Sequence, residues 1–240
     1  MIIIAILIST LLAGFIQGVS GFGAGIVFMS VIPYFLSVIS SAVISNFMSV
    51  FLNLLMTYHY RQAINKTIIV LPALFFIIGG TLSLYFVTMI DTAFLKLILG
   101  LFLTILAIYF YFCSHRVKIT NNIFTMFLCG FVSGVCDGLF GIGGPLMVLF
   151  FLALTNSKDE YLGTISLFFL IICSYNLIFR IVHGIFTLQL LPYALLSLIM
   201  VFVGLQLGNR VVCKIDEQRL RKITYILIGF SGIITLLTAI

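Results

Sequence analysis

Long apolar runs follow one another along this chain, and polar residues gather in the short segments between them. A helix needs about 20 apolar residues to cross the hydrocarbon core of a bilayer. Six runs have about this length and predict unbroken transmembrane helices at 40–59, 67–88, 94–113, 162–182, 188–209 and 220–239. The pattern predicts an all-α polytopic membrane protein.

Two further apolar stretches, 2–37 and 122–155, are too long for one ordinary crossing. Glycine clusters interrupt them at "GVSGFGAG" (Gly18–Gly25) and "GVCDGLFGIGGP" (Gly134–Pro145). Glycine and proline are the poorest helix formers. Each stretch is therefore predicted to break into a helical hairpin.

The two halves of the chain resemble each other. "FIQGVSGFGAGI" (Phe15–Ile26) parallels "FVSGVCDGLFGIGGPL" (Phe131–Leu146) with a short gap, and "MIDTAFLKLILG" (Met89–Gly100) parallels "KIDEQRLRKITYI" (Lys214–Ile226). Each half holds a glycine-broken hairpin followed by three helices, a repeat that is common in transporters. We expect a single membrane domain over 1–240, with repeat 1 at about 1–115 and repeat 2 at about 120–240.

Composition and charge support this class and orient the chain. The sequence is 63% hydrophobic and 8% charged, against about 25% charged in soluble domains. If each broken stretch crosses once, the basic residues divide five against seven. If each is a hairpin, ten share one side and two the other, as the excess of basic residues in cytoplasmic loops requires. The ten are Arg61, Lys66, Arg116, Lys118, Lys158, Arg210, Lys214, Arg219, Arg221 and Lys222, and the two are Lys96 and Arg180.

The hairpin topology inverts the second repeat and places both termini outside the cytoplasm of a cell membrane. It allows six full spans plus two re-entrant hairpins, or up to ten segments if the hairpins cross completely. The net charge of +6 does not call for a nucleic-acid partner, because basic residues in cytoplasmic loops account for it. The lipid bilayer is the expected surrounding, and the oligomeric state stays open.

The hairpin tips are the candidate binding site. A glycine tip exposes backbone N–H groups at the start of the next helix, where the helix dipole favours an anion. The alternative is that these glycines only let helices pack closely, which is the role expected of Gly204 and Gly208. The substrate-binding glycines predicted are Gly21, Gly23, Gly25, Gly141, Gly143 and Gly144.

The motifs "GFGAGI" (Gly21–Ile26) and "GIGGPL" (Gly141–Leu146), each followed by an apolar helix, resemble the sulfite exporter TauE/SafE family. The first motif lacks the proline of the second, so its tip is expected to differ in shape. The resemblance spans nearly the whole chain. It implies a transporter of a sulfur-containing anion such as sulfite or an organosulfonate, and it does not fix the substrate.

Asp137 is the one acidic residue in the interior of an apolar stretch, where charged groups are costly and face a cavity or a partner. It either couples a proton to transport or caps the broken helix. An anion beside it would be repelled unless the carboxyl is protonated.

Other polar residues complete the candidate site. Arg180 could pair with an oxyanion, or its charge could lie in interfacial water. Asn53 falls near the repeat counterpart of Asn176, and uncharged donors suit an anion that must later leave. Interhelical hydrogen bonding is the alternative for these amides. The predicted binding side chains are Gln17, Ser20, Asn53, Asn176 and Arg180, while Ser45, Asn46 and Ser49 receive less weight.

The cysteines form no paired motif and are interpreted as small apolar residues. No catalytic, metal or phosphate-loop pattern is present in the sequence, and we expect no cofactor and no enzymatic activity. The sequence predicts a secondary transporter of a small anion, with alternating access around the paired tips. An anion channel of the same fold is the alternative, and a membrane enzyme or assembly factor is less favoured.

Overall fold

The computed structural model describes residues 2–112 and 122–211. Within these ranges the chain forms nine α-helices and three short 3-10 helices, without a strand. The α-helices are α1 (Ile2–Ser20), α2 (Ala24–Val31), α3 (Val38–His59), α4 (Val70–Phe86), α5 (Thr92–Phe112), α6 (Ile123–Phe140), α7 (Gly144–Leu154), α8 (Lys158–Val182) and α9 (Leu191–Val211). The 3-10 helices are η1 (Ile32–Tyr34), η2 (Val87–Met89) and η3 (Leu188–Leu190).

Five of the six predicted unbroken helices are present as α3, α4, α5, α8 and α9. The sixth, 220–239, lies outside the described residues, as does the repeat counterpart at 214–226. Polar side chains begin three of the helices: Ser37, Asn122 and Ser157 accept a backbone N–H at the starts of α3, α6 and α8, as N-cap residues do. Five described helices are long and apolar enough to cross a membrane. The predicted all-α polytopic fold is confirmed.

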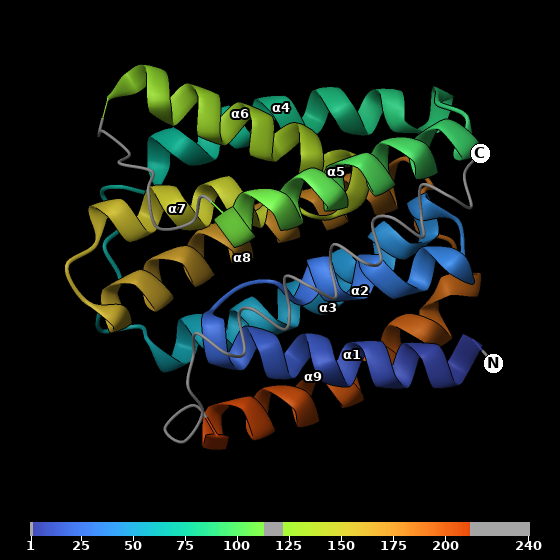
Figure 1. Cartoon of the computed structure of the whole chain (residues 1–240), viewed down its shortest axis with the longest axis horizontal. Coiled ribbons are helices and arrows are strands. Elements are labelled where there is room, and N and C mark those ends of the chain that lie inside the picture. Colours follow the sequence, from blue (N-terminus) through green and yellow to red (C-terminus); the bar gives the residue numbers. More distant parts are fainter. Residues whose placement is uncertain (1, 113–121, 212–240) are drawn as a thin grey trace.

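Both over-long stretches are helical hairpins. The segment Gly21–Gly23 separates α1 from α2, and Gly141–Gly143 separates α6 from α7. In Figure 1, α2 runs back beside α1 and α7 runs back from the tip of α6, and the two hairpins start from opposite ends of the molecule. The inverted relation of two complete repeats stays a prediction, because the last predicted helix is not described.

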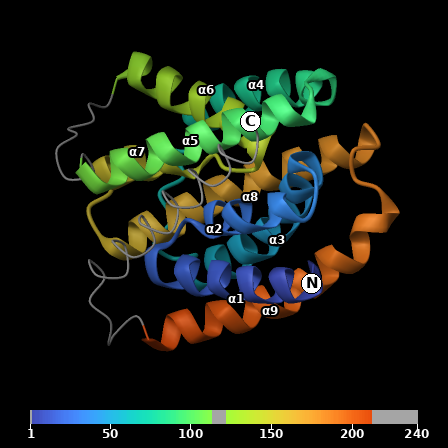
Figure 2. The ribbon, with the colours of Figure 1, turned by 45° about the vertical axis from the view of Figure 1, so that its right-hand side comes forward.

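Each of the three main helix pairs joins one helix from the first half of the chain to one from the second half. Helix α1 lies along α9, and α6 lies along α4, while α3 and α8 pack against each other between these pairs (Figures 1 and 2). A Cβ atom on Gly208 would lie 2.5 Å from the Phe15 carbonyl oxygen, and one on Gly130 would lie 2.9 Å from that of Pro72. Small residues allow this close approach, which supports the packing role predicted for Gly204 and Gly208.

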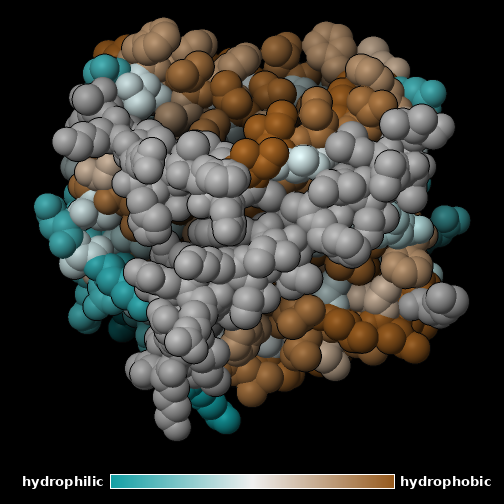
Figure 3. Space-filling model, in the orientation of Figure 1, coloured by the Kyte–Doolittle hydropathy of each residue, from teal (hydrophilic) through white to brown (hydrophobic). Residues whose placement is uncertain are grey.

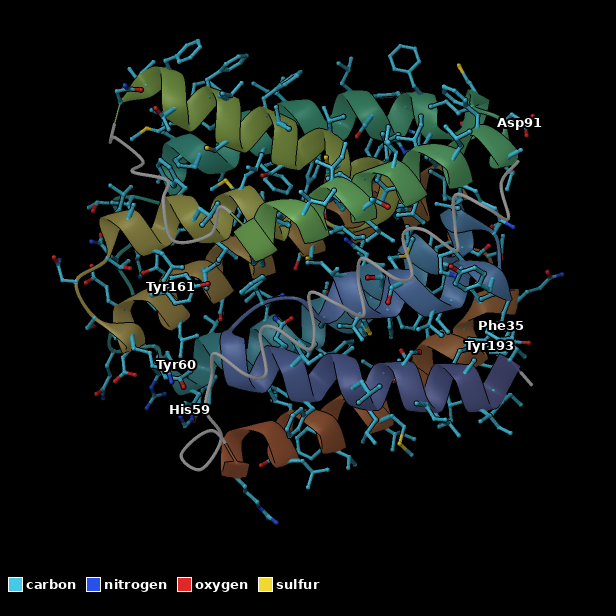
Figure 4. The ribbon with its side chains drawn as sticks, in the orientation of Figure 1. Phe35, His59, Tyr60, Asp91, Tyr161 and Tyr193 are labelled. Carbon is cyan, nitrogen blue, oxygen red and sulfur yellow. The ribbon has the colours of Figure 1, made fainter. Side chains whose placement is uncertain are left out.

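The outer surface fits a bilayer. In Figure 3 apolar surface dominates the upper and lower edges, and hydrophilic groups gather at the left and right ends. His59, Tyr60 and Tyr161 mark one end in Figure 4, and Asp91 and Tyr193 mark the other. At the His59 end, the loop after α3 contains Arg61 and Lys66, α8 begins at Lys158, and α9 ends beside Arg210. Which end faces the cytoplasm stays a prediction.

Candidate functional site

Each hairpin turns at a glycine in the left-handed backbone region. Gly21 has φ 78° and Gly141 has φ 66°, a conformation that glycine adopts without steric cost. The N–H of Gly21 donates to the Gln17 carbonyl at 2.8 Å, and that of Gly141 donates to the Asp137 carbonyl at 2.7 Å. Both first helices therefore end in the same way.

The two tips then diverge. Gly23, before α2, has φ 100°, whereas Gly143, before α7, has φ −101°. Helix α7 carries a proline in its first turn and α2 does not. This difference in shape agrees with the expectation drawn from the missing proline of the first motif.

The shared hydrogen bond fixes the register between the tips. The segments "QGVSGFGAG" (Gln17–Gly25) and "DGLFGIGGP" (Asp137–Pro145) align without a gap, because 120 residues separate Gln17 from Asp137 and also Gly21 from Gly141. Gln17 is therefore the structural counterpart of Asp137. The sequence predicts both residues as members of the site, but not as counterparts.

Gln17 links three elements of the first half. Its Oε1 accepts the N–H of Ala24, the first residue of α2, at 3.3 Å. Its Nε2 donates to Oδ1 of Asn53 on α3, also at 3.3 Å. The side chain thus satisfies one backbone donor at the start of α2 and connects the tip to α3.

Asp137 makes the corresponding links in the second half. Its carboxyl group accepts the N–H of Gly143 at the start of α7. Its Oδ2 accepts Nδ2 of Asn176 on α8 at 2.5 Å. The capping role considered for Asp137 is therefore present in the structure, and its side chain occupies an N–H that the sequence analysis assigned to an anion.

Arg180 lies in the interior although its Cα is near the end of α8. Helical side chains extend toward the N-terminus of their helix, so the guanidinium group reaches back toward Asn176. It is 0% exposed, and its Nη2 donates to the Gly138 carbonyl in the last turn of α6 at 2.8 Å. The alternative that this charge lies in interfacial water is therefore wrong.

A small cavity lies between the two tips, and we call it the tip cavity. Its volume is about 50 Å³, several times the ~10–15 Å³ that one water needs. Backbone of both tips, polar side chains and apolar side chains line it. The lining residues are Gly23, Gly25, Gly141, Gly143, Gly144; Gln17, Ser49, Asn53, Asp137, Cys173; and Phe22, Ile26, Ile142, Phe169.

The structure brings most of the predicted site residues together. A Cβ on Gly25 would lie 2.8 Å from the Gly141 carbonyl oxygen, so the two tips are in close contact. Gly21 instead faces Leu162 and Tyr161 of α8, and Asn176 and Arg180 stand behind the lining. The side chain of Ser20 lies outside the described residues.

Several lining residues were not predicted or received less weight. Ser49 lies one helical turn before Asn53, and Cys173 lies three residues before Asn176. Residues three or four apart share a helix face, so this spacing could have indicated both. Cys173 is a cavity residue, which the interpretation of the cysteines as apolar packing overlooked.

Comparison with known proteins gives two matches. A family model described as "Sulfite exporter TauE/SafE" matches residues 6–235. A probable membrane transporter protein of Methanocaldococcus jannaschii is 29% identical over 161 residues, which cover 63% of this chain and 60% of that protein. The match thus spans less than two thirds of the relative. No solved structure matches the chain.

Proposed function

The chain belongs to the sulfite exporter TauE/SafE family of membrane transporters, and we propose that it is a secondary transporter that moves a small anion through the tip cavity. Family membership supports the predicted class, a membrane transporter and not an enzyme. By analogy with the family, the proposed substrate is sulfite, an organosulfonate or a related sulfur-containing anion.

The observation that carries this proposal is the shared lining of the tip cavity by both hairpins. The first turn of a helix has backbone N–H groups without partners inside the helix, and the starts of α2 and α7 both border the cavity. Gln17 and Asp137 accept one such group at each tip, and the other first-turn groups are left for a ligand. These groups and the two helix dipoles favour an anion. Transporters with repeated hairpins bind substrate between the repeats and alternate access by rocking them.

Asp137 is the proposed coupling residue. It is the one carboxyl group among the described cavity-lining residues, and its negative charge opposes an anion in the same space. Protonation removes that charge. A proton gradient across the membrane is therefore the proposed energy source.

The test is uptake into liposomes that contain the full chain under an imposed proton gradient. Radiolabelled sulfite, thiosulfate, sulfate, taurine and methanesulfonate form the panel. We expect uptake of at least one sulfur-containing anion by the protein and none by empty liposomes. Lack of uptake for every member would contradict the proposed substrate class.

Two variants sharpen the test. Gly143→Val should abolish uptake, because even a Cβ at this position would lie 2.8 Å from the Cβ of Asp137. Asp137→Asn separates a transporter from a channel of the same fold. Flux that follows membrane potential alone and is unchanged in Asp137→Asn would favour the channel.

A further inference from the structure

Two opposite charges stand beside the tip cavity in the apolar interior of the described structure. Asp137 lines the cavity from α6, and Arg180 of α8 lies behind it. The two are near enough for their charges to interact. Within the described helices, α1, α2, α4 and α7 contain no acidic residue, basic residue or histidine.

Other titratable groups on the packed helices are thiols, phenols or groups at helix ends. The thiols of Cys136 and Cys173 are close enough to interact with Asp137, and the Tyr175 hydroxyl is hydrogen-bonded to Thr81. The remainder, among the side chains that the structure describes on these helices, are Tyr58, His59, Tyr85, Lys96, Cys129, Lys158, Asp159, Glu160, Tyr161, Tyr193 and Arg210. The charge of the cavity wall is therefore set by Asp137 and Arg180.

The guanidinium group of Arg180 uses only part of its hydrogen-bonding capacity. Its Nη2 has a partner, whereas Nε and Nη1 have no hydrogen-bond partner in the described part of the protein. With Asp137 ionised, the pair has no net charge and presents its negative member to the cavity. With Asp137 protonated, the pair has a net charge of one positive unit beside the tips.

We propose that the tip cavity binds one proton, on Asp137, together with one singly charged anion, and that the two cross the membrane in the same direction. This inference rests on the proposed transport function and specifies its coupling and substrate charge. Protonation removes the repulsion that faces the anion and leaves Arg180 to balance the anion's charge. Proton and anion therefore strengthen each other's binding by the same factor.

Charge balance favours binding of the proton and the anion together over binding of either one alone. The empty cavity and the doubly loaded cavity each have no net charge, whereas either ligand alone leaves a charge in an apolar interior, where it is disfavoured. A doubly charged anion would leave a negative charge even with the proton bound. The substrates are therefore singly charged oxyanions, such as a sulfonate or hydrogen sulfite, and the anion accumulates on the alkaline side of the membrane.

The experiment uses the full chain in liposomes that enclose a pH-sensitive dye. Methanesulfonate is the probe because its single charge does not change with pH, and sulfate is the doubly charged comparison. We expect methanesulfonate uptake to acidify the interior, one proton per anion, without net current, and sulfate uptake to be at least about tenfold slower. Uptake without proton entry, proton exit during uptake, or equal uptake of sulfate would overturn the inference and leave anion transport in place.

Binding to the purified protein gives a second measurement. Methanesulfonate affinity should fall about tenfold per pH unit once Asp137 ionises, and Asp137→Asn should bind with an affinity independent of pH. Asp91→Asn is the matched control, because Asp91 is exposed and caps α5 through the Ala93 N–H, a role that asparagine fills equally well. A wild-type affinity that does not change with pH overturns the inference even if Asp137→Asn fails to fold. Absence of both uptake and binding for every anion would overturn the proposed function as well.

Discussion

Gln17 and Asp137 occupy equivalent positions in the two hairpins. Each lies four residues before a left-handed glycine, accepts a backbone N–H at the start of the following helix, and hydrogen-bonds an asparagine of a central helix. The two halves thus hold their tips by the same kind of contact. One half uses a neutral amide and the other a carboxyl group, so the proton coupling that we propose involves the second tip alone.

Gln17→Glu tests this equivalence. A second carboxylate would face the tip cavity at neutral pH, and charges a few ångströms apart repel by several kcal/mol at intermediate dielectric. Methanesulfonate binding should weaken at least about tenfold at neutral pH and recover on acidification. Gln62→Glu, on an exposed loop, is the control. Equal affinities in the two variants would argue against the assigned position of Gln17.

Asp137 and Arg180 should depend on each other for stability. Removing one member of a buried charged pair costs about 3–5 kcal/mol, because the other charge is left uncompensated. Asp137→Asn and Arg180→Gln should each destabilise by about this amount, and the double variant by clearly less than the sum. Unfolding of the detergent-solubilised protein by sodium dodecyl sulfate measures the cycle. Strictly additive losses would show that the two charges do not interact.

The packing of α4 against α6 offers a matched pair of glycines. A Cβ on Gly134 would lie 2.9 Å from the Gly80 backbone nitrogen, whereas one on Gly80 would meet its nearest atom at 3.5 Å. Gly134→Ala should therefore destabilise the protein by about 1–3 kcal/mol, as overpacking does, and Gly80→Ala should not. The same unfolding assay distinguishes them. Equal stability of the two variants would contradict the close approach of α6 to α4.

Cys173 provides a test of the cavity volume. Cys173→Leu adds bulk to a cavity of about 50 Å³ and should reduce anion uptake by more than about tenfold, while the smaller Cys173→Ser retains it. Cys129→Leu is the control, because Cys129 is buried on α6 and does not line the tip cavity. Wild-type uptake by Cys173→Leu would remove Cys173 from the substrate path.

The hairpins could be predicted from the sequence because both apolar runs are too long for one ordinary crossing and both are interrupted in the middle by glycine, a poor helix former. The pairing of Gln17 with Asp137 could not. The two residues differ in type, and aligning Phe15 with Phe131 requires a gap that hides their shared distance from the tip glycine.

Side-chain direction explains the remaining differences. Arg180 is near a helix end in sequence, yet its long side chain extends back to the Gly138 carbonyl, and its burial depends on α6 ending beside it. Ser49 and Cys173 line the cavity because of how α3 and α8 are rotated in the bundle. Hydropathy patterns do not define that rotation when all faces of a helix are apolar.

The central claim is that one anion is held between both tips, and protection from chemical modification tests it most directly. Phe22 and Ile142 are counterparts in the two tips, and both line the cavity. Phe22→Cys and Ile142→Cys, each in a chain whose native cysteines are replaced by serine, are treated with N-ethylmaleimide with and without methanesulfonate. We predict that the anion slows modification at both positions at the concentration that saturates uptake. Protection at only one tip, or at neither, would contradict a site shared by the two hairpins.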